Sequence, residues 1–227
     1  MYKNKKISVI IPALNEEKSI PLVINDHPKG IVDEIIVVDN GSSDNTPLVA
    51  EKAGAVVVRE ETKGYGLACQ RGISRAKASD IIVILDADYS DYPDRINHLL
   101  APIVDHGFDM VLGSRTLGNT EKGALTLPQI FGNRFATFLI KLVTGFKYTD
   151  MGPFRAIRTQ TLKDLTMTDK NYGWNVEMQI KAVKKGLRIK EVPVDYRNRI
   201  GTSKISGTIS GIIKAGTKIV YSVFKYS

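Results

Sequence analysis

Cysteine, histidine and long apolar runs are all scarce in this 227-residue sequence. The single cysteine, Cys69, excludes a disulfide framework and a thiolate metal site, and it fits a reducing compartment. His27, His98 and His106 lack the spacing of metal ligands. No uncharged apolar run reaches the roughly 18 residues of a membrane span, and no signal peptide is recognisable. The composition, with 43% hydrophobic and 25% charged residues, predicts a folded globular chain rather than a disordered one.

Acidic residues are scarce in the second half of the chain. Residues 1–100 carry 12 basic and 15 acidic side chains, whereas residues 101–227 carry 20 and 9, and no acid follows Asp195. This asymmetry predicts an anionic partner for the second half. Composition alone leaves nucleic acid, a phosphorylated ligand and a membrane surface open.

The first half alternates between short apolar, β-branched runs and segments with helical patterns. The expected strands are residues 7–11, 35–38, 55–58 and 81–85, and the expected helices are residues 18–25, 46–53, 66–78 and 93–104. Continuous apolar strands that alternate with helices indicate an α/β fold with a doubly wound, mostly parallel sheet and flanking helices. In such folds ligands bind beyond the carboxyl ends of the strands.

The second half is less regular. The expected strands are residues 109–113, 154–157 and 189–194, and the expected helices are residues 128–144, 174–185 and 205–224. With no linker composition and no repeat, we expect one domain over residues 1–204, followed by a C-terminal helical appendage over residues 205–227.

Asp86-Ala87-Asp88 follows an apolar strand and is the most distinctive local motif. Two carboxylates one residue apart at a strand end can hold a hard divalent cation such as Mg²⁺ or Mn²⁺, with phosphate oxygens in its open positions. An Asx turn that merely closes the strand is an equally good interpretation of this motif by itself.

Two further strand ends carry polar side chains. Asp39 closes the second strand, where its carboxylate can accept a hydrogen bond from a nucleobase or cap a turn. Asn15 and Glu16 follow the first strand and can cap a helix or contact a nucleotide. Residues 64–66, Gly-Tyr-Gly, lack the third glycine of a dinucleotide fingerprint, so we expect no Rossmann cofactor site there.

The combination of motifs is more specific than any one of them. In order along the chain they are IIPALNEE, VVDNGSSDNT, KGYGLACQRG, LDADYSDYP, GSR, GNR, DMGPFR, GWNVEMQIKA and RIGTSK. Over residues 7 to about 204 the chain resembles the family 2 glycosyltransferases of the GT-A fold. Within that family it is similar to the polyprenyl-phosphate (dolichol-phosphate) mannosyl- and glucosyltransferases.

The resemblance implies roles for individual residues. The positions that would bind the nucleotide-diphosphate sugar are Pro12, Leu14, Glu16, Asp39 and Ala87, with Arg199 and Lys204 on its phosphates. Asp86 and Asp88 would hold Mg²⁺ or Mn²⁺, and Arg115 and Arg134 would receive the phosphate of the acceptor. The resemblance therefore implies an inverting transfer of a hexose to a polyprenyl phosphate, and no nucleic-acid partner.

Three positions depart from the usual family pattern. The family commonly has one more residue between the positions of Arg199 and Lys204, and a histidine at the position of Asp91. Residues 150–155, Asp-Met-Gly-Pro-Phe-Arg, replace a more usual Ser-Gly-Phe-Arg ending.

The acceptor class depends on whether a general base is present. A phosphate acceptor is already ionised at neutral pH and needs only charge neutralisation and orientation, which arginines supply. A hydroxyl on a lipid or glycan, the alternative acceptor, would need a carboxylate base. Glu177 and Asp150 are the candidates, although Glu177 can instead pair with Lys181 at i,i+4 and Asp150 can cap a turn.

The last predicted helix is amphipathic. Its apolar residues lie on one side and Lys204, Lys214, Lys218 and Lys225 lie within about 80° of arc on the other. Such a helix can lie in an anionic bilayer interface, which predicts a peripheral enzyme on the cytoplasmic face of a membrane. A helix packed on the domain with a solvated lysine face is nearly as good an interpretation. The apolar side chains of the helix at residues 128–144 can extend a membrane-facing patch or belong to the core; they are Phe131, Phe135, Phe138 and Leu142.

Overall fold

The computed structural model describes residues 1–76, 78–201 and 209–227, with the side chains of residues 209–215 left aside. The first part of the chain forms β1 (Ile7–Ala13), α1 (Ile20–Asn25), β2 (Glu34–Asp39), α2 (Thr46–Lys52), β3 (Val56–Arg59), α3 (Tyr65–Arg75), β4 (Ile81–Ile84), the 3₁₀ turn η1 (Pro93–Arg95) and α4 (Ile96–His106). The second part forms β5 (Met110–Ser114), α5 (Leu127–Thr144), β6 (Arg155–Arg158), α6 (Thr159–Asp164), α7 (Trp174–Lys184), β7 (Ile189–Pro193) and α8 (Ile209–Tyr226).

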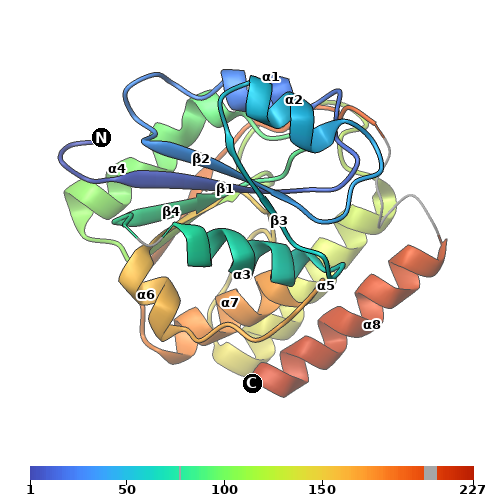
Figure 1. Cartoon of the computed structure of the whole chain (residues 1–227). Coiled ribbons are helices and arrows are strands. Elements are labelled where there is room, and N and C mark those ends of the chain that lie inside the picture. Colours follow the sequence, from blue (N-terminus) through green and yellow to red (C-terminus); the bar gives the residue numbers. More distant parts are fainter. Residues whose placement is uncertain (77, 202–208) are drawn as a thin grey trace.

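The strands form one seven-stranded sheet in the order β3-β2-β1-β4-β6-β5-β7. Figure 1 shows β1 to β4 with α1 and α2 on one side of the sheet and α3 on the other. All pairs are parallel except those of β6, which runs antiparallel to both β4 and β5. The mostly parallel, doubly wound sheet predicted from the sequence is therefore confirmed. The antiparallel direction of β6 was not predicted, because a four-residue apolar run does not reveal its direction.

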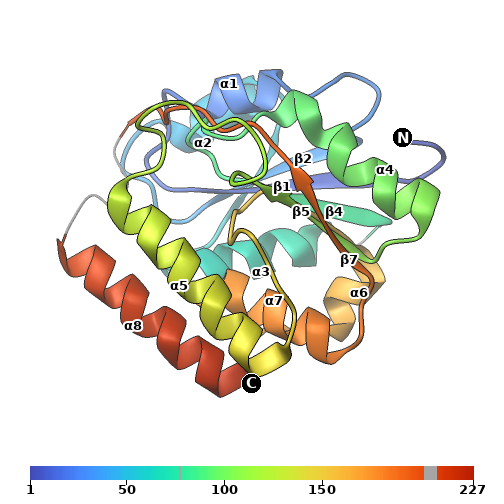
Figure 2. The same ribbon diagram turned by 180° about the vertical axis from the view of Figure 1, so that it is seen from behind.

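Side chains alternate across the sheet, so each face has its own core. Ile7, Val9 and Ile11 of β1 pack on the face covered by α1, α2 and α4. Ile10 of β1 joins the other core, to which α3, α5, α6, α7 and α8 contribute buried residues. Figure 2 shows α5 and α8 side by side at one end of that second layer.

The parallel strands end at a common edge. Ala13 at the end of β1 pairs with Asp39 at the end of β2, and Ile10 of β1 pairs with Ile84, the last residue of β4. Asp86 lies two residues beyond Ile84, at the same edge. The register therefore brings together strand ends that are far apart in sequence.

The predicted elements are present, with shifts of a few residues at their ends. The helix α6 was missed, because six residues are too few for a helical period to be visible. The first residues of the predicted C-terminal helix, 205–208, lie outside the described residues, as does Lys204. Within the described chain no helix combines the length and the apolarity needed to cross a bilayer.

Candidate active site

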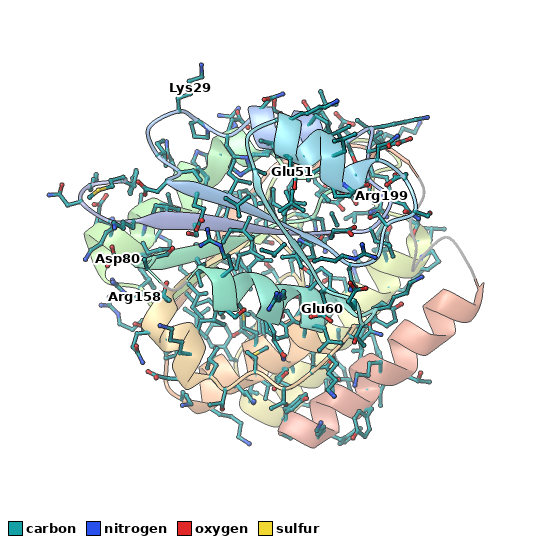
Figure 3. All side chains as sticks on the ribbon, viewed as in Figure 1. Lys29, Glu51, Glu60, Asp80, Arg158 and Arg199 are labelled. Carbon is teal, nitrogen blue, oxygen red and sulfur yellow. The ribbon has the colours of Figure 1, made fainter. Side chains whose placement is uncertain are left out.

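A cavity of about 590 Å³ opens at the carboxyl edge of the sheet. Most of the residues singled out in the sequence line it: Pro12, Leu14, Glu16, Asp86, Ala87, Asp88, Arg115 and Arg199. Asp80 immediately precedes β4 and so marks the amino end of that strand. Figure 3 shows Arg199 at the opposite side of the molecule from Asp80. The strand ends, the segment that carries Arg199, and the helices α5 and α8 thus surround one space.

Asp88 is a buried carboxylate of this cavity with several partners. Its side chain is buried, and Oδ1 accepts hydrogen bonds from the backbone N–H of Ser90 at 2.9 Å and from the Ser90 hydroxyl at 2.5 Å. Oδ2 forms an ion pair with the guanidinium of Arg199. Asp88 and Arg199 meet because backbone hydrogen bonds join their two segments. The Ile200 N–H donates to the Asp88 carbonyl, and the Arg197 N–H donates to the Ser90 carbonyl.

Arg197 fixes this backbone pairing. Its guanidinium lies over the ring of Tyr89, 3.2 Å from the centroid, and 4.4 Å from that of Tyr92. It also donates to the Asp26 carboxylate at 3.1 Å. Tyr89 has a φ of 67°, a left-handed conformation that is unfavourable for a residue with a bulky side chain and persists only where the surroundings hold it. The turn after Asp88 is therefore held from both sides.

The second carboxylate of the motif, Asp86, has a different environment. Burial raises its pKa, although the nearby guanidinium groups of Arg199 and Arg115 act in the opposite direction. Asp91 is fully buried close by, and burial together with the negative charge of Asp86 raises its pKa to about 7. Carboxyl groups thus crowd a poorly solvated corner that disfavours their ionisation, and a cation bound there would stabilise their ionised forms.

The donor set in this corner fits a hard divalent cation that is shared with a ligand. Asp86 and Asp88 offer carboxylate oxygens to the cavity, and Oδ2 of Asp88 already faces a positive charge there, the guanidinium of Arg199. The described residues contain no group of three or more acidic, histidine or cysteine side chains that could hold a metal alone. Two protein carboxylates are sufficient for Mg²⁺ where phosphate oxygens and water complete the coordination.

Arg115 lines the same cavity as the two aspartates and is held by Asp150. The guanidinium donates through Nε and Nη2 to the two Asp150 oxygens, each at 2.7 Å, and the Arg115 N–H donates to Oδ2 at 2.8 Å. Burial disfavours the charge of Arg115, but the ion pair with Asp150 outweighs burial and raises its pKa. The guanidinium also stacks 5.0 Å from the ring centroid of Tyr196. Arg115 is therefore a fixed positive charge, and Nη1 is not used by Asp150.

A second, smaller cavity of about 320 Å³ adjoins the first. Arg134 lines this cavity and not the larger one, and its side chain is exposed. Arg115, Gln129 and Asn133 line both cavities. The two arginines expected from the sequence to bind a phosphate thus border one space, next to the cavity with the aspartates.

Two further predicted residues, Asp39 and Glu177, do not line the larger cavity. Asp39 is buried at the end of β2, where its carboxylate accepts the Ser42 N–H at 3.0 Å, while its neighbour Asn40 lines the cavity. Glu177 is fully buried; it accepts the N–H groups of Thr168 and Asp169 and pairs with Lys181 at 2.6 Å. The i,i+4 pair is therefore confirmed, and the placement of Glu177 corrects the assignment of a general base to it.

Several polar residues of the cavity were missed in the sequence: Lys63, Tyr65, Asn133, Asn171, Tyr172, Asn175 and Tyr196. Lys63 and Tyr65 belong to the segment with Gly64 and Gly66, and a packing requirement explains those glycines. A Cβ on Gly66 would lie 2.1 Å from the Asp169 carbonyl oxygen, so the start of α3 contacts backbone of the second half. The glycine spacing was the available signal for this contact.

Comparison with known proteins agrees with the geometry. Residues 8–166 match the family described as "Glycosyl transferase family 2". A dolichyl-phosphate hexose transferase of Haloferax volcanii is 34% identical over 220 residues, which cover 92% of this chain and 91% of that protein. An uncharacterised glycosyltransferase of Mycobacterium tuberculosis is 34% identical over 212 residues, which cover 92% and 94%.

The fold is also that of a solved glycosyltransferase. Glucosyl-3-phosphoglycerate synthase from Mycobacterium tuberculosis, in complex with Mn²⁺, uridine diphosphate and phosphoglyceric acid, matches with a TM-score of 0.79 at 23% identity. The match covers 99% of this chain and 79% of that one, and it shows a common GT-A fold. On its sequence and its fold, the chain belongs to glycosyl transferase family 2.

Proposed function

We propose that the protein transfers a hexose, with inversion, from a nucleoside-diphosphate sugar to a polyprenyl phosphate. The observation that carries this proposal is that Arg115 borders both cavities. It joins a carboxylate corner suited to a metal-bound diphosphate to a second space bordered by Arg134. Two anionic groups can therefore be held next to each other, as transfer between a diphosphate and a phosphate requires.

The nucleotide would lie against the ends of β1 and β2. Pro12 and Leu14 offer apolar contacts, and Asn40 and Glu16 offer polar ones from the same wall. Asn40 is itself held, because it accepts the Gly64 N–H at 2.7 Å and donates to the Thr62 carbonyl at 2.8 Å. A preorganised wall lowers the entropic cost of fixing the donor.

Asp86 and Asp88 would hold Mg²⁺ or Mn²⁺ against the diphosphate, as the Mn²⁺ and uridine diphosphate of the structural neighbour suggest. When bound, the cation stabilises the negative charge that develops on the leaving diphosphate. Arg199 would add its own positive charge to the same group, and Lys204, outside the described residues, is proposed for this role from the sequence motif alone. Arg199 already lies in this corner through its ion pair with Asp88.

The state of the candidate bases favours a phosphate acceptor over a hydroxyl. Asp150 is paired with Arg115, and Glu177 is paired with Lys181 outside the cavity. Neither is available to deprotonate a hydroxyl. The dolichyl-phosphate hexose transferase among the relatives points the same way. A hydroxyl acceptor is the second candidate, because the structural neighbour was solved with phosphoglyceric acid.

A membrane lipid acceptor would bring the enzyme to a membrane surface. We propose that it acts peripherally on the cytoplasmic face, since no described helix is suited to cross the bilayer and the acceptor phosphate lies at the bilayer surface. The single cysteine, Cys69, is free and buried, which agrees with a reducing compartment.

A transfer assay with purified protein tests the proposal. Uridine- and guanosine-diphosphate hexoses are supplied with Mn²⁺, Mg²⁺ or a chelator, and the acceptor is a short polyprenyl phosphate, the matching alcohol or 3-phosphoglycerate. We expect product only with the polyprenyl phosphate and a divalent cation. Product with the alcohol or with 3-phosphoglycerate, and none with the phosphate, would replace the proposal by the hydroxyl alternative.

A further inference from the structure

The outer face of α5 carries an uninterrupted apolar stripe that nothing in the described chain covers. Phe131 and Leu142 are each 66% exposed, and between them Phe135 and Phe138 are more than half exposed. With Leu127 at the start of the helix, these side chains fall within about 80° of arc. Large apolar side chains are usually buried, and a row of exposed ones marks a surface that meets an apolar partner.

The opposite face of α5 lines both cavities. Gln129 and Asn133 border the larger and the smaller cavity, Ala136 borders the larger one, and Ile140 is fully buried in the core. One helix therefore separates the substrate cavities from the apolar stripe. Whatever covers the stripe lies about one helix diameter, roughly 10 Å, from the site.

The neighbouring helix α8 extends this surface only in part. Tyr221 is exposed and Phe224 is 68% exposed, but Val223 is fully buried. Lys218 points inward, where Nζ pairs with the buried Asp169 carboxylate at 2.8 Å. The buried Val223 agrees with the expectation of a helix packed on the domain, whereas the expectation that its lysine face is solvated is wrong at Lys218. The larger exposed apolar surface belongs to α5.

The charge around the stripe has one sign. Residues 122–149 contain no Asp or Glu and carry Lys122, Arg134, Lys141 and Lys147, and residues 196–227 also contain no acid. The side chains of Arg134 and Lys141 are exposed on α5, about 60–80° around the helix from Phe131. Basic side chains that border an apolar stripe complement an anionic surface with an apolar interior.

We propose that the outer face of α5 inserts into the interface of an anionic lipid bilayer. This rests on the proposed function in one respect, that the acceptor is a membrane lipid. It deepens that function, because α5 becomes the boundary that a lipid phosphate passes to reach Arg134 and Arg115. A second copy of the chain is a poorer occupant, since two such faces would bring like charges together.

Vesicle flotation with the full chain and no substrate tests this surface. The vesicles are phosphatidylcholine with or without phosphatidylglycerol, at low and at high salt. Phe131→Ser with Phe138→Ser is the test variant, and Leu22→Ser with Leu48→Ser, exposed leucines on α1 and α2, is the matched control. We expect the wild type and the control to float with anionic vesicles at low salt. The affinity of the test variant for these vesicles should be lower by at least about tenfold.

The test variant should fold normally, because both phenylalanines are exposed, and should retain transfer to a short soluble polyprenyl phosphate. Equal flotation of the test variant and wild type, or no flotation of the wild type at low salt, would overturn the proposal. A wild-type dimer in analytical ultracentrifugation that the test variant abolishes, with no flotation, would overturn it in favour of self-association. A failure of transfer with intact vesicle binding would instead count against the proposed function and leave this surface supported.

Discussion

The two halves of the molecule build their parts of the site in different ways. In the first half, Asp86 and Asp88 reach the cavity because a buried parallel strand ends just before them. In the second half, Arg115 directly follows β5 and its guanidinium is held by Asp150, whereas Arg134 is an exposed residue of α5. The end of β4 brings Asp86 and Asp88 to the cavity by backbone geometry, whereas a pair of side chains holds the guanidinium of Arg115 in place.

This difference has energetic consequences. A strand-end carboxylate keeps its position when its charge is removed, because backbone hydrogen bonds of the sheet hold the chain. A buried arginine keeps its position only while its partner is ionised. Substitutions in the first half should therefore separate activity from stability, whereas those around Arg115 should affect both.

The largest effect is expected for the double variant Asp86→Asn, Asp88→Asn. Neutral amides keep the shape of the turn but remove the charges that would bind the cation, so transfer should fall by about 10³-fold or more. Thermal denaturation should show a folded protein with a single transition. Asp94→Asn, an exposed carboxylate in the nearby turn η1, is the control and should leave transfer unchanged. Transfer by the double variant at wild-type rates would remove the metal from the proposal.

Asp150→Asn tests the second half and should lower both activity and stability. The variant leaves the Arg115 guanidinium buried without its counter-charge, which typically costs about 3–5 kcal/mol in the free energy of unfolding. Urea denaturation measures this cost. The matched control is Asp105→Asn, whose partner Lys3 is exposed, and its cost should stay below about 1 kcal/mol. Equal costs for the two variants would show that burial does not distinguish these pairs.

Arg134→Gln should have a smaller effect, limited to the acceptor. The side chain is exposed, so stability should not change, while loss of one charge-assisted hydrogen bond should raise the KM for a short polyprenyl phosphate by about tenfold. Lys141→Gln, two turns further along α5, is the control, and it should leave the KM for the same soluble acceptor unchanged. An increase in the KM of the nucleotide sugar instead would move Arg134 to the donor side.

Sequence reasoning recovered most of the first half and part of the second. Apolar β-branched runs fixed four parallel strands, and the rule that ligands bind at carboxyl ends of strands predicted where Asp86 and Asp88 would lie. The pair of Arg199 with Asp88 joins residues that are distant in sequence, and no local pattern reveals it. The resemblance supplied Arg115, but its partner Asp150 was visible only in three dimensions.

The exposed stripe on α5 shows a second kind of limit. A helix with apolar residues on two faces is equally consistent with a central core helix and with a surface helix that meets lipid. The sequence left Phe131, Phe135 and Phe138 open for this reason, and only their exposure decides between the two interpretations. Burial depends on which neighbours the fold provides, so it could not be predicted from the pattern alone.

The smallest expected effect concerns His27 and separates the pH dependence of folding from that of the site. The ring lies at the end of α1, where Nδ1 donates to the Val23 carbonyl at 2.8 Å and the buried Nε2 has no hydrogen-bond partner among the described residues. Burial lowers the pKa of His27 below 6.5, although the backbone of Val23 and Ile24 and the charge of Asp26 act in the opposite direction.

A histidine with a lowered pKa binds fewer protons in the folded than in the unfolded state. The contribution of His27 to the free energy of unfolding should therefore be constant above pH 6.5 and should decrease as the pH falls through 6.5 toward the folded-state pKa. The raised pKa of Asp91 acts in the opposite direction in this range, and it does so equally in the wild type and in a His27 variant. His27→Asn keeps a donor for Val23 and removes the titration, so the free energy of unfolding of the wild type should decrease relative to that of the variant as the pH falls over that interval. Urea denaturation at pH 7.5 and 5.5 measures both slopes. Because His27 lies outside both cavities, the pH profile of transfer should be the same in the variant, and a shifted profile would show that the two regions are coupled.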